Sequence, residues 1–141
     1  MNTAAEYVIN PTLMMGTVRE IQDELVTIHL RGRLGVIRIA KKHFKGSQNL
    51  AVDTKVRFFF SYIHVVETVY EFDNAIVNQA YDLSPSLLHG EITDVNDTSV
   101  QVEMAGNLGT VIVPRRWVFT NQALEKEQQV SFYFSYMEVI D

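Results

Sequence analysis

Histidine, serine and carboxylate side chains could perform catalysis in this sequence, but their spacing argues against it. His29, His43, His64 and His89 do not share the spacing of metal ligands, and no cysteine is present to supply a thiolate ligand or a thiol nucleophile. Neither a glycine-rich phosphate loop nor a G-x-S-x-G nucleophile motif occurs. The sequence therefore predicts a protein that is not an enzyme, with no metal and no cofactor.

A basic segment offers a different chemistry, the binding of phosphate groups. Lysine and arginine side chains that project from one surface contact the phosphates of a polyanion such as single-stranded RNA. The candidate nucleic-acid-binding residues are His29, Arg31, Arg33, Arg38, Lys41, Lys42 and Lys45. The alternative is that these charges only keep a strand surface soluble and prevent edge-to-edge pairing.

Aromatic residues mark a second candidate surface. The motif F-x-F-S-Y occurs at Phe58–Tyr62 and again at Phe132–Tyr136. Because side chains alternate along a strand, the middle residues Phe59 and Tyr133 should point away from their phenylalanine neighbours. We expect these two residues and Trp117 to form an interface, between parts of the chain or with a partner. For Trp117 the alternative is that it caps a core.

These candidate residues belong to an internal repeat. Shifting the sequence by 74 positions aligns residues 7–67 with 81–141 without a gap, and 17 of the 61 aligned pairs are identical. Chance would give about four identities at average residue frequencies. The chain is therefore a tandem duplication, which predicts a first repeat (residues 1–67), a connector (68–80) and a second repeat (81–141).

Apolar residues alternate with polar ones in both repeats, which is typical of half-buried strands. In the first repeat the alternation covers residues 26–30, 36–39 and 56–62, and a further strand is expected near 13–21. Residues 41–52 break the alternation and predict a short helical turn or a loop. Units of about 60 residues with four such strands favour two small antiparallel barrels, an all-β fold.

The glycine and apolar spacing resembles a known family. The run G-T-V-x-x-I-x-x-x-x-V-x-I-x-L-x-G-x-x-G-V-I, from Gly16 to Ile37, resembles the first strands of S1-like OB-fold domains, and Gly90–Val111 resembles them equally. Such spacing also suits SH3-like barrels. The resemblance implies an RNA-binding strand face, although aromatic residues that stack on bases in S1-like domains are absent at the matching positions of this chain.

Charge divides the two repeats and leaves two functions open. Residues 1–67 carry nine basic and six acidic side chains, whereas residues 75–141 carry three and nine, within a net charge of −5. The basic surface of the first repeat favours a weak polyanion or single-stranded RNA site. Alternatively, the chain is an assembly module in which the basic repeat meets the acidic repeat of a neighbouring molecule. No signal peptide or membrane span is evident, so we expect a cytoplasmic protein with no membrane partner.

Overall fold

The computed structural model describes residues 11–45, 50–66, 86–120 and 123–140, and the expected connector at 68–80 lies outside them. The first repeat forms β1 (Thr12–Gln22), β2 (Leu25–Leu30), β3 (Val36–Ala40), β4 (Phe44–Lys45), β5 (Lys55–Phe60) and β6 (Ile63–Val66). The second forms β7 (Ser86–Val95), β8 (Ser99–Met104), β9 (Gly109–Pro114), β10 (Val118–Phe119), β11 (Gln129–Phe134) and β12 (Met137–Ile140). The all-β class predicted from the alternation is confirmed.

Short 3-10 turns link several strands at equivalent places in the two repeats. They are η2 (Arg31–Arg33), η3 (Lys41–His43), η5 (Ala105–Asn107) and η6 (Arg115–Trp117). The helical turn expected after the third strand is thus η3 in the first repeat and η6 in the second. In the described ranges no helix is long and apolar enough to cross a membrane.

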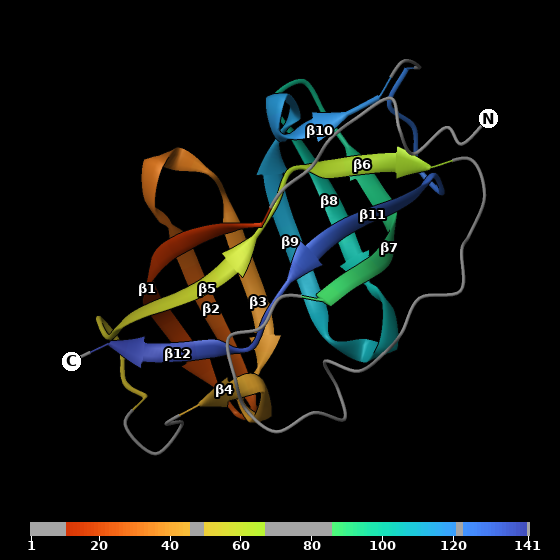
Figure 1. Cartoon of the computed structure of the whole chain (residues 1–141). Helices are drawn as coiled ribbons and strands as arrows, with labels where there is room; N and C mark the ends of the chain where they lie inside the picture. Colours follow the sequence, from red (N-terminus) through yellow and green to blue (C-terminus); the bar gives the residue numbers. More distant parts are fainter. Residues whose placement is uncertain (1–10, 46–49, 67–85, 121–122, 141) are drawn as a thin grey trace.

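All twelve strands belong to one sheet, which the additional pairing of β11 with β5 partly closes (Figure 1). At the β3–β9 pairing the sheet divides into two curved groups of strands, which we call the first and second rings. In one ring β1 pairs with β2 and β5, β2 pairs with β3, and β12 pairs with β5 and, in parallel, with β4. The other ring has the same order, with β7 beside β8 and β11 and with β6 beside β11 and, in parallel, beside β10. Equivalent strands therefore occupy equivalent places.

The last strand of each repeat pairs with strands of the other repeat. β6 follows β5 after only two residues, yet it lies between β10 and β11 of the second repeat. In the same way β12 lies between β4 and β5 of the first repeat, and Figure 1 shows both strands among those of the opposite repeat. The repeat boundaries in the sequence therefore differ from the grouping of strands in space.

This exchange divides the strand expected over residues 56–62. The chain leaves β5 at Ser61 and Tyr62 and resumes as β6 at Ile63. A two-residue hairpin would require residues that accept positive φ, typically asparagine and glycine, and neither Ser61 nor Tyr62 has a positive φ. The chain consequently runs on to the other repeat instead of turning back.

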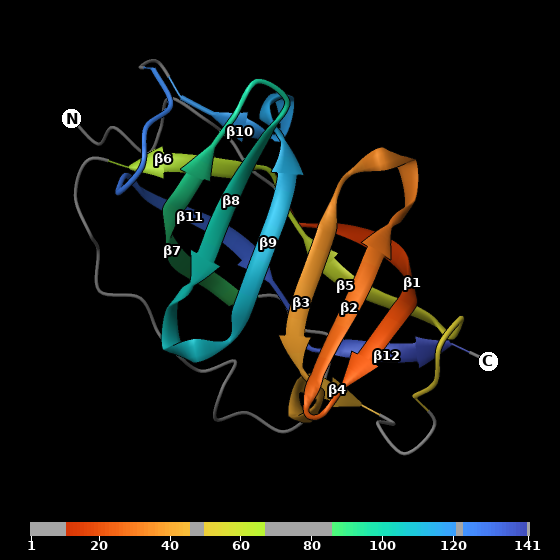
Figure 2. The ribbon, with the colours of Figure 1, turned by 180° about the vertical axis from the view of Figure 1, so that it is seen from behind.

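Two glycines permit the contact that joins the rings. β3 and β9 pair antiparallel from Val36↔Ile112 to Ile39↔Gly109 and lie side by side when seen from behind (Figure 2). A Cβ at Gly35 would overlap the carbonyl oxygen of Ile112, and a Cβ at Gly109 would overlap that of Arg38. Both glycines also have positive φ, 110° and 152°. Their identity in the two repeats thus has a steric reason.

One apolar core extends through both rings. The phenylalanines at the first and third positions of the two F-x-F-S-Y motifs are fully buried, and they form edge-to-face pairs across the point where β5 meets β11, at Phe60↔Phe134. Phe60 and Phe134, for example, have ring centroids 5.9 Å apart. The two repeats therefore bury their largest side chains against each other.

Candidate polyanion-binding face

The seven candidate nucleic-acid-binding residues singled out in the sequence lie in two places. His29 in β2 and Arg31 and Arg33 in η2 are exposed at one end of the β2–β3 pair. η3 follows the opposite end of β3 and contains the exposed Lys42 and the half-buried Lys41. Arg38 is exposed between the two ends, and Lys45 lies in β4, where its side chain is outside the described part of the structure. The predicted set is thus not one compact patch.

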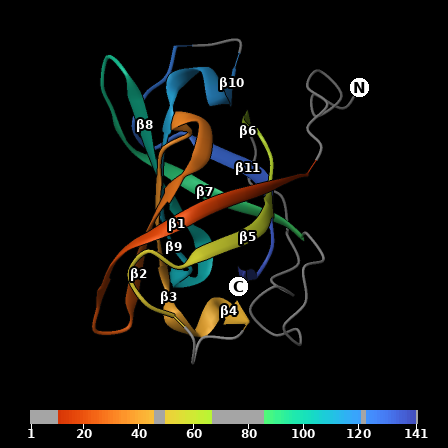
Figure 3. The ribbon, with the colours of Figure 1, turned by 90° about the vertical axis from the view of Figure 1, so that its left-hand side faces the viewer.

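The pairing of β1 adds residues that the sequence did not single out. Thr17 lies opposite both His29 on β2 and Lys55 on β5, so these three residues form one row across three strands. Viewed from the side of the first repeat, β1 runs between its two partners (Figure 3). We call Thr17, Arg19, His29, Arg31 and Lys55 the Thr17 cluster.

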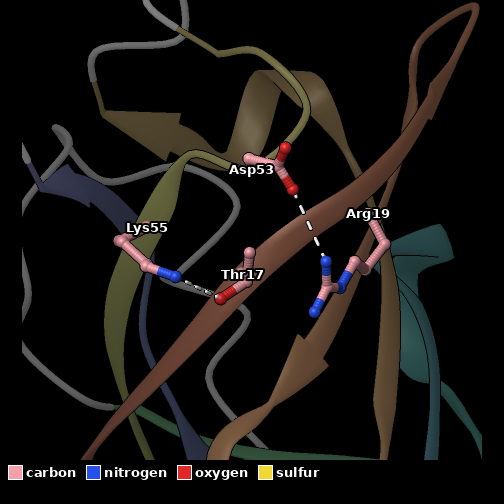
Figure 4. Close-up of polar contacts among 4 residues, drawn as sticks. All are labelled: Thr17, Arg19, Asp53 and Lys55. Carbon is pink, nitrogen blue, oxygen red and sulfur yellow. Dashed lines mark hydrogen bonds and ion pairs between the residues drawn. The ribbon is translucent and has the colours of Figure 1, made fainter.

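Specific contacts hold the side chains of the Thr17 cluster. Lys55 Nζ donates a hydrogen bond of 3.2 Å to Thr17 Oγ1 (Figure 4). Nη1 of Arg31 lies 3.6 Å from the sulfur of Met15. Arg19 occupies the irregularity in the β1–β2 register between Val18 and Glu20, which turns an extra side chain outward. The cluster therefore gathers three cations and a hydroxyl beside an exposed histidine.

Few carboxylates offset this charge. Arg19 faces Asp53 at 3.5 Å (Figure 4), but both side chains are more than half exposed, so the pair contributes little. Arg57, the next outward residue of β5, donates from Nε to Glu138 of β12 at 2.7 Å and is thereby neutralised. Within the described residues, Arg31 and Lys55 have no carboxylate at ion-pair distance. Their charge is available to an anion.

Alternation within strands is the signal that would have found the missing members. Val56 and Phe58 point inward, so Lys55 and Arg57 must point outward. The same reasoning applies to Thr17 between the buried Gly16 and Val18. Only the pairing of β1 with both β2 and β5, however, brings these residues into one cluster.

The equivalent place in the second repeat is acidic and hollow. A surface cavity of about 260 Å³ is lined there by residues that include Glu91, Thr93, Glu103 and Gln129. These four correspond, at the offset of 74, to Thr17, Arg19, His29 and Lys55. Glu91 and Glu103 lie directly opposite each other on β7 and β8. The two repeats thus present opposite charges at the same place in the fold.

The three expected interface residues lie near the strand exchange. Phe59 and Tyr133 are half-buried, and their backbone N–H groups donate 2.8 Å hydrogen bonds to Ser135 Oγ and Ser61 Oγ of the opposite repeat. Trp117 is buried, and its Nε1 donates to the carbonyl oxygen of Ser61 at 2.9 Å. Each of the three therefore makes a hydrogen bond between the repeats, through the backbone or the indole.

His43 is the histidine most changed by its surroundings. It is buried in η3, and its Nδ1 has no hydrogen-bond partner among the described residues. Burial, with a smaller contribution from the charge of Lys42, lowers the pKa of His43 to about 4. No group of three or more histidine, aspartate or glutamate side chains in the described ranges could hold a metal ion. His43 is therefore neutral near pH 7 and belongs to the core.

Comparison with known proteins does not extend these observations. No protein-family model matches the chain, and no curated protein matches it. A function for this chain is therefore inferred from its own residues.

Proposed function

We propose that this chain is a non-catalytic binding protein that holds a polyanion, single-stranded RNA in particular, on the outer face of the first ring. The observation that carries the proposal is the Thr17 cluster, in which Arg19, Arg31 and Lys55 gather and, among the described residues, only Arg19 has a carboxylate, the exposed Asp53, at ion-pair distance. Phosphate contacts of this kind supply affinity without reading sequence.

The strand order supports a place for this site within an OB-type fold. In OB barrels the first strand pairs with the second and the fourth, and the face of the second and third strands binds oligonucleotides. Here β1 pairs with β2 and β5, and β4, which continues β3 after η3, runs parallel to the closing strand. We propose that each ring is a small barrel of this type and that the two tandem barrels exchange their last strands.

Fluorescence anisotropy with a labelled single-stranded oligoribonucleotide tests the polyanion site. We expect binding at 50 mM salt that weakens steeply toward 200 mM, because bound phosphates release counterions. Combined substitution of Arg31→Glu and Lys55→Glu should abolish binding. Lys126→Glu is the matched control, since Lys126 is exposed in the second repeat, outside the cluster.

Two results would oppose the proposal. One is the absence of binding at low salt, and the other is equal loss of affinity in the control and the double variant. Melting curves of each variant would show whether the substitutions leave the fold intact.

The acidic cavity favours a second candidate function, self-assembly. The Thr17 cluster of one molecule and the cavity beside Glu91 and Glu103 of another have opposite charge. Sedimentation velocity at 50 and 300 mM salt distinguishes the candidates, since self-assembly predicts oligomers at low salt in the absence of RNA. A protein that sediments as a monomer at both salt concentrations would contradict self-assembly.

A further inference from the structure

The two repeats are related by an approximate two-fold axis that passes between β3 and β9. Ile37 pairs with Val111 near the centre of these strands, and Phe60 pairs with Phe134 where β5 meets β11. Both pairs join residues that are equivalent at the offset of 74. Equivalent residues face each other in an antiparallel pair only where a two-fold axis runs between the strands. The axis therefore places equivalent outer surfaces of the two repeats on opposite sides of the molecule.

The Thr17 cluster and the acidic cavity are such a pair of surfaces. In the sheet, β1 is separated from β7 by β2, β3, β9 and β8. β1 lies at one flank of the molecule and β7 at the other, both in the front view (Figure 1) and in the view from behind (Figure 2). One molecule therefore presents the cations of the cluster in one direction and the carboxylates of the cavity in the other.

The carboxylates of the cavity lack a compensating charge. Glu91 and Glu103 lie directly opposite each other on β7 and β8, and like charges in this position destabilise a sheet. The amide of Gln129 donates to Glu91 Oε1 at 3.4 Å, but within the described residues neither glutamate has a cation at ion-pair distance. A cation from outside the molecule would relieve this repulsion.

The Thr17 cluster of a second copy supplies such cations. Arg31 and Lys55 are exposed, and in the part of the chain that the structure describes neither has a carboxylate at ion-pair distance. The cavity of about 260 Å³ is far larger than the space that one water molecule needs, so it admits the end of a cationic side chain. Opposite charges on two surfaces steer them together and fix their relative orientation.

We infer that copies of this chain associate head to tail, with the Thr17 cluster of one copy against the acidic cavity of the next. This inference rests on self-assembly, the second function proposed above. Because the two surfaces face opposite directions, each contact is heterologous and leaves a free cluster at one end and a free cavity at the other. Association therefore continues past two copies instead of closing as a dimer. A polyanion that occupies the Thr17 cluster competes with this contact and shortens the assemblies.

Two neutral variants of the intact chain test the head-to-tail contact by sedimentation velocity at 50 mM salt. Arg31→Gln with Lys55→Gln removes charge from the cluster and keeps the cavity, whereas Glu91→Gln with Glu103→Gln does the reverse. The wild type should form species larger than a dimer whose size grows with protein concentration, and each variant alone should stay monomeric. An equimolar mixture of the variants retains one native contact per pair, so it should stop at a dimer with one copy of each. Recovery on mixing also shows that both variants are folded.

Matched controls carry the same chemical change at other places. Arg116→Gln and Asp97→Asn neutralise exposed side chains of the second repeat that do not line the cavity, and both variants should assemble like the wild type. Inorganic tripolyphosphate should return the wild type to monomers. Sodium chloride at the same ionic strength is the control for screening and should shorten the assemblies less.

The outcomes separate the inference from the functions proposed above. A wild type that stops at two copies would overturn the head-to-tail arrangement while self-assembly stands. Larger assemblies that form equally well in either charge variant would place the contact elsewhere and also overturn the inference. Tripolyphosphate that has no more effect than sodium chloride would overturn the competition for the Thr17 cluster. A wild type that stays monomeric would refute self-assembly together with the inference, whereas the anisotropy measurement decides the polyanion site independently.

Discussion

Two serines show how single side chains hold the strand exchange. Ser61 Oγ accepts the N–H of Tyr133 and donates to the carbonyl oxygen of Tyr62 at 2.9 Å, and Ser135 Oγ does the same with Phe59 and Tyr136. Both serines are buried. Each hydroxyl thus satisfies a backbone donor of the opposite repeat at the point where the chain leaves one ring for the other.

Replacing either serine should weaken the whole fold. Ser135→Ala leaves the N–H of Phe59 without its acceptor, and we expect a loss of about 1–3 kcal/mol in the free energy of unfolding. Urea denaturation measures it. Ser131→Ala is the matched control, because Ser131 is also a buried residue of the second repeat but makes no side-chain hydrogen bond within the described residues. Equal losses in the two variants would show that the exchange does not depend on this hydroxyl.

Burial of His43 predicts a dependence of stability on pH. Its pKa is about 4 in the folded chain and near 6.5 when exposed, so the unfolded chain binds the proton more readily. The stabilisation is complete above pH 6.5 and is lost as the pH falls toward 4. The loss is on the order of 3 kcal/mol, at about 1.4 kcal/mol for each pKa unit. Lys42, the charged neighbour, acts in the same direction.

Urea denaturation between pH 7 and 4 checks this prediction, with His43→Phe as the comparison. The variant keeps a flat ring but cannot take up a proton, so its free energy of unfolding should change less with pH over this interval. Identical slopes for the two proteins would mean that His43 takes up its proton without loss of stability.

At the scale of the element, alternation located the strands but not their partners. β2, β3 and β5 are found where apolar residues recur every second position, and the matched glycines mark turns and the β3–β9 contact. The exchange of β6 and β12 is not visible in this pattern. Both strands carry matching apolar residues, Val65 with Val139 and Val66 with Ile140, so either strand fits either ring.

The candidate site was predictable only in part for the same reason. Alternation of side chains places His29 and Arg38 on the outside of their strands, as expected from the sequence, and both are exposed. Arg31 is also exposed, but it lies in η2, outside the strand in which the sequence pattern placed it. Lys55 and His29, 26 positions apart, come into one row only because β1 pairs with both of their strands and Thr17 lies between them. The sequence feature that indicates the exchange is the residue types of the Ser61–Tyr62 link, which are not those of a tight two-residue hairpin.

At the scale of the molecule, the exchange makes the two repeats depend on each other. Each ring takes one strand, β6 or β12, from the other repeat. Ile63 of β6 and Met137 of β12 are buried, and each lies in a strand that pairs with the other repeat. Burying a side chain of this size stabilises a fold by about 1.5–3 kcal/mol. A separated repeat would lose that contribution, the strand hydrogen bonds and the shared phenylalanine packing together.

We therefore predict that residues 1–74 and 75–141, produced separately, do not fold as monomers but recover the native fold when mixed. Trp117 reports the recovery, because its indole lies in one fragment and its acceptor, Ser61, in the other. Emission should shift on mixing with the concentration dependence of a bimolecular reaction, and native mass spectrometry should find one copy of each fragment. Two monomers that each unfold cooperatively near the midpoint of the intact chain would contradict the exchange. Fragments 1–74 with Ser61→Ala should associate more weakly, since Tyr133 then lacks its acceptor across the repeats.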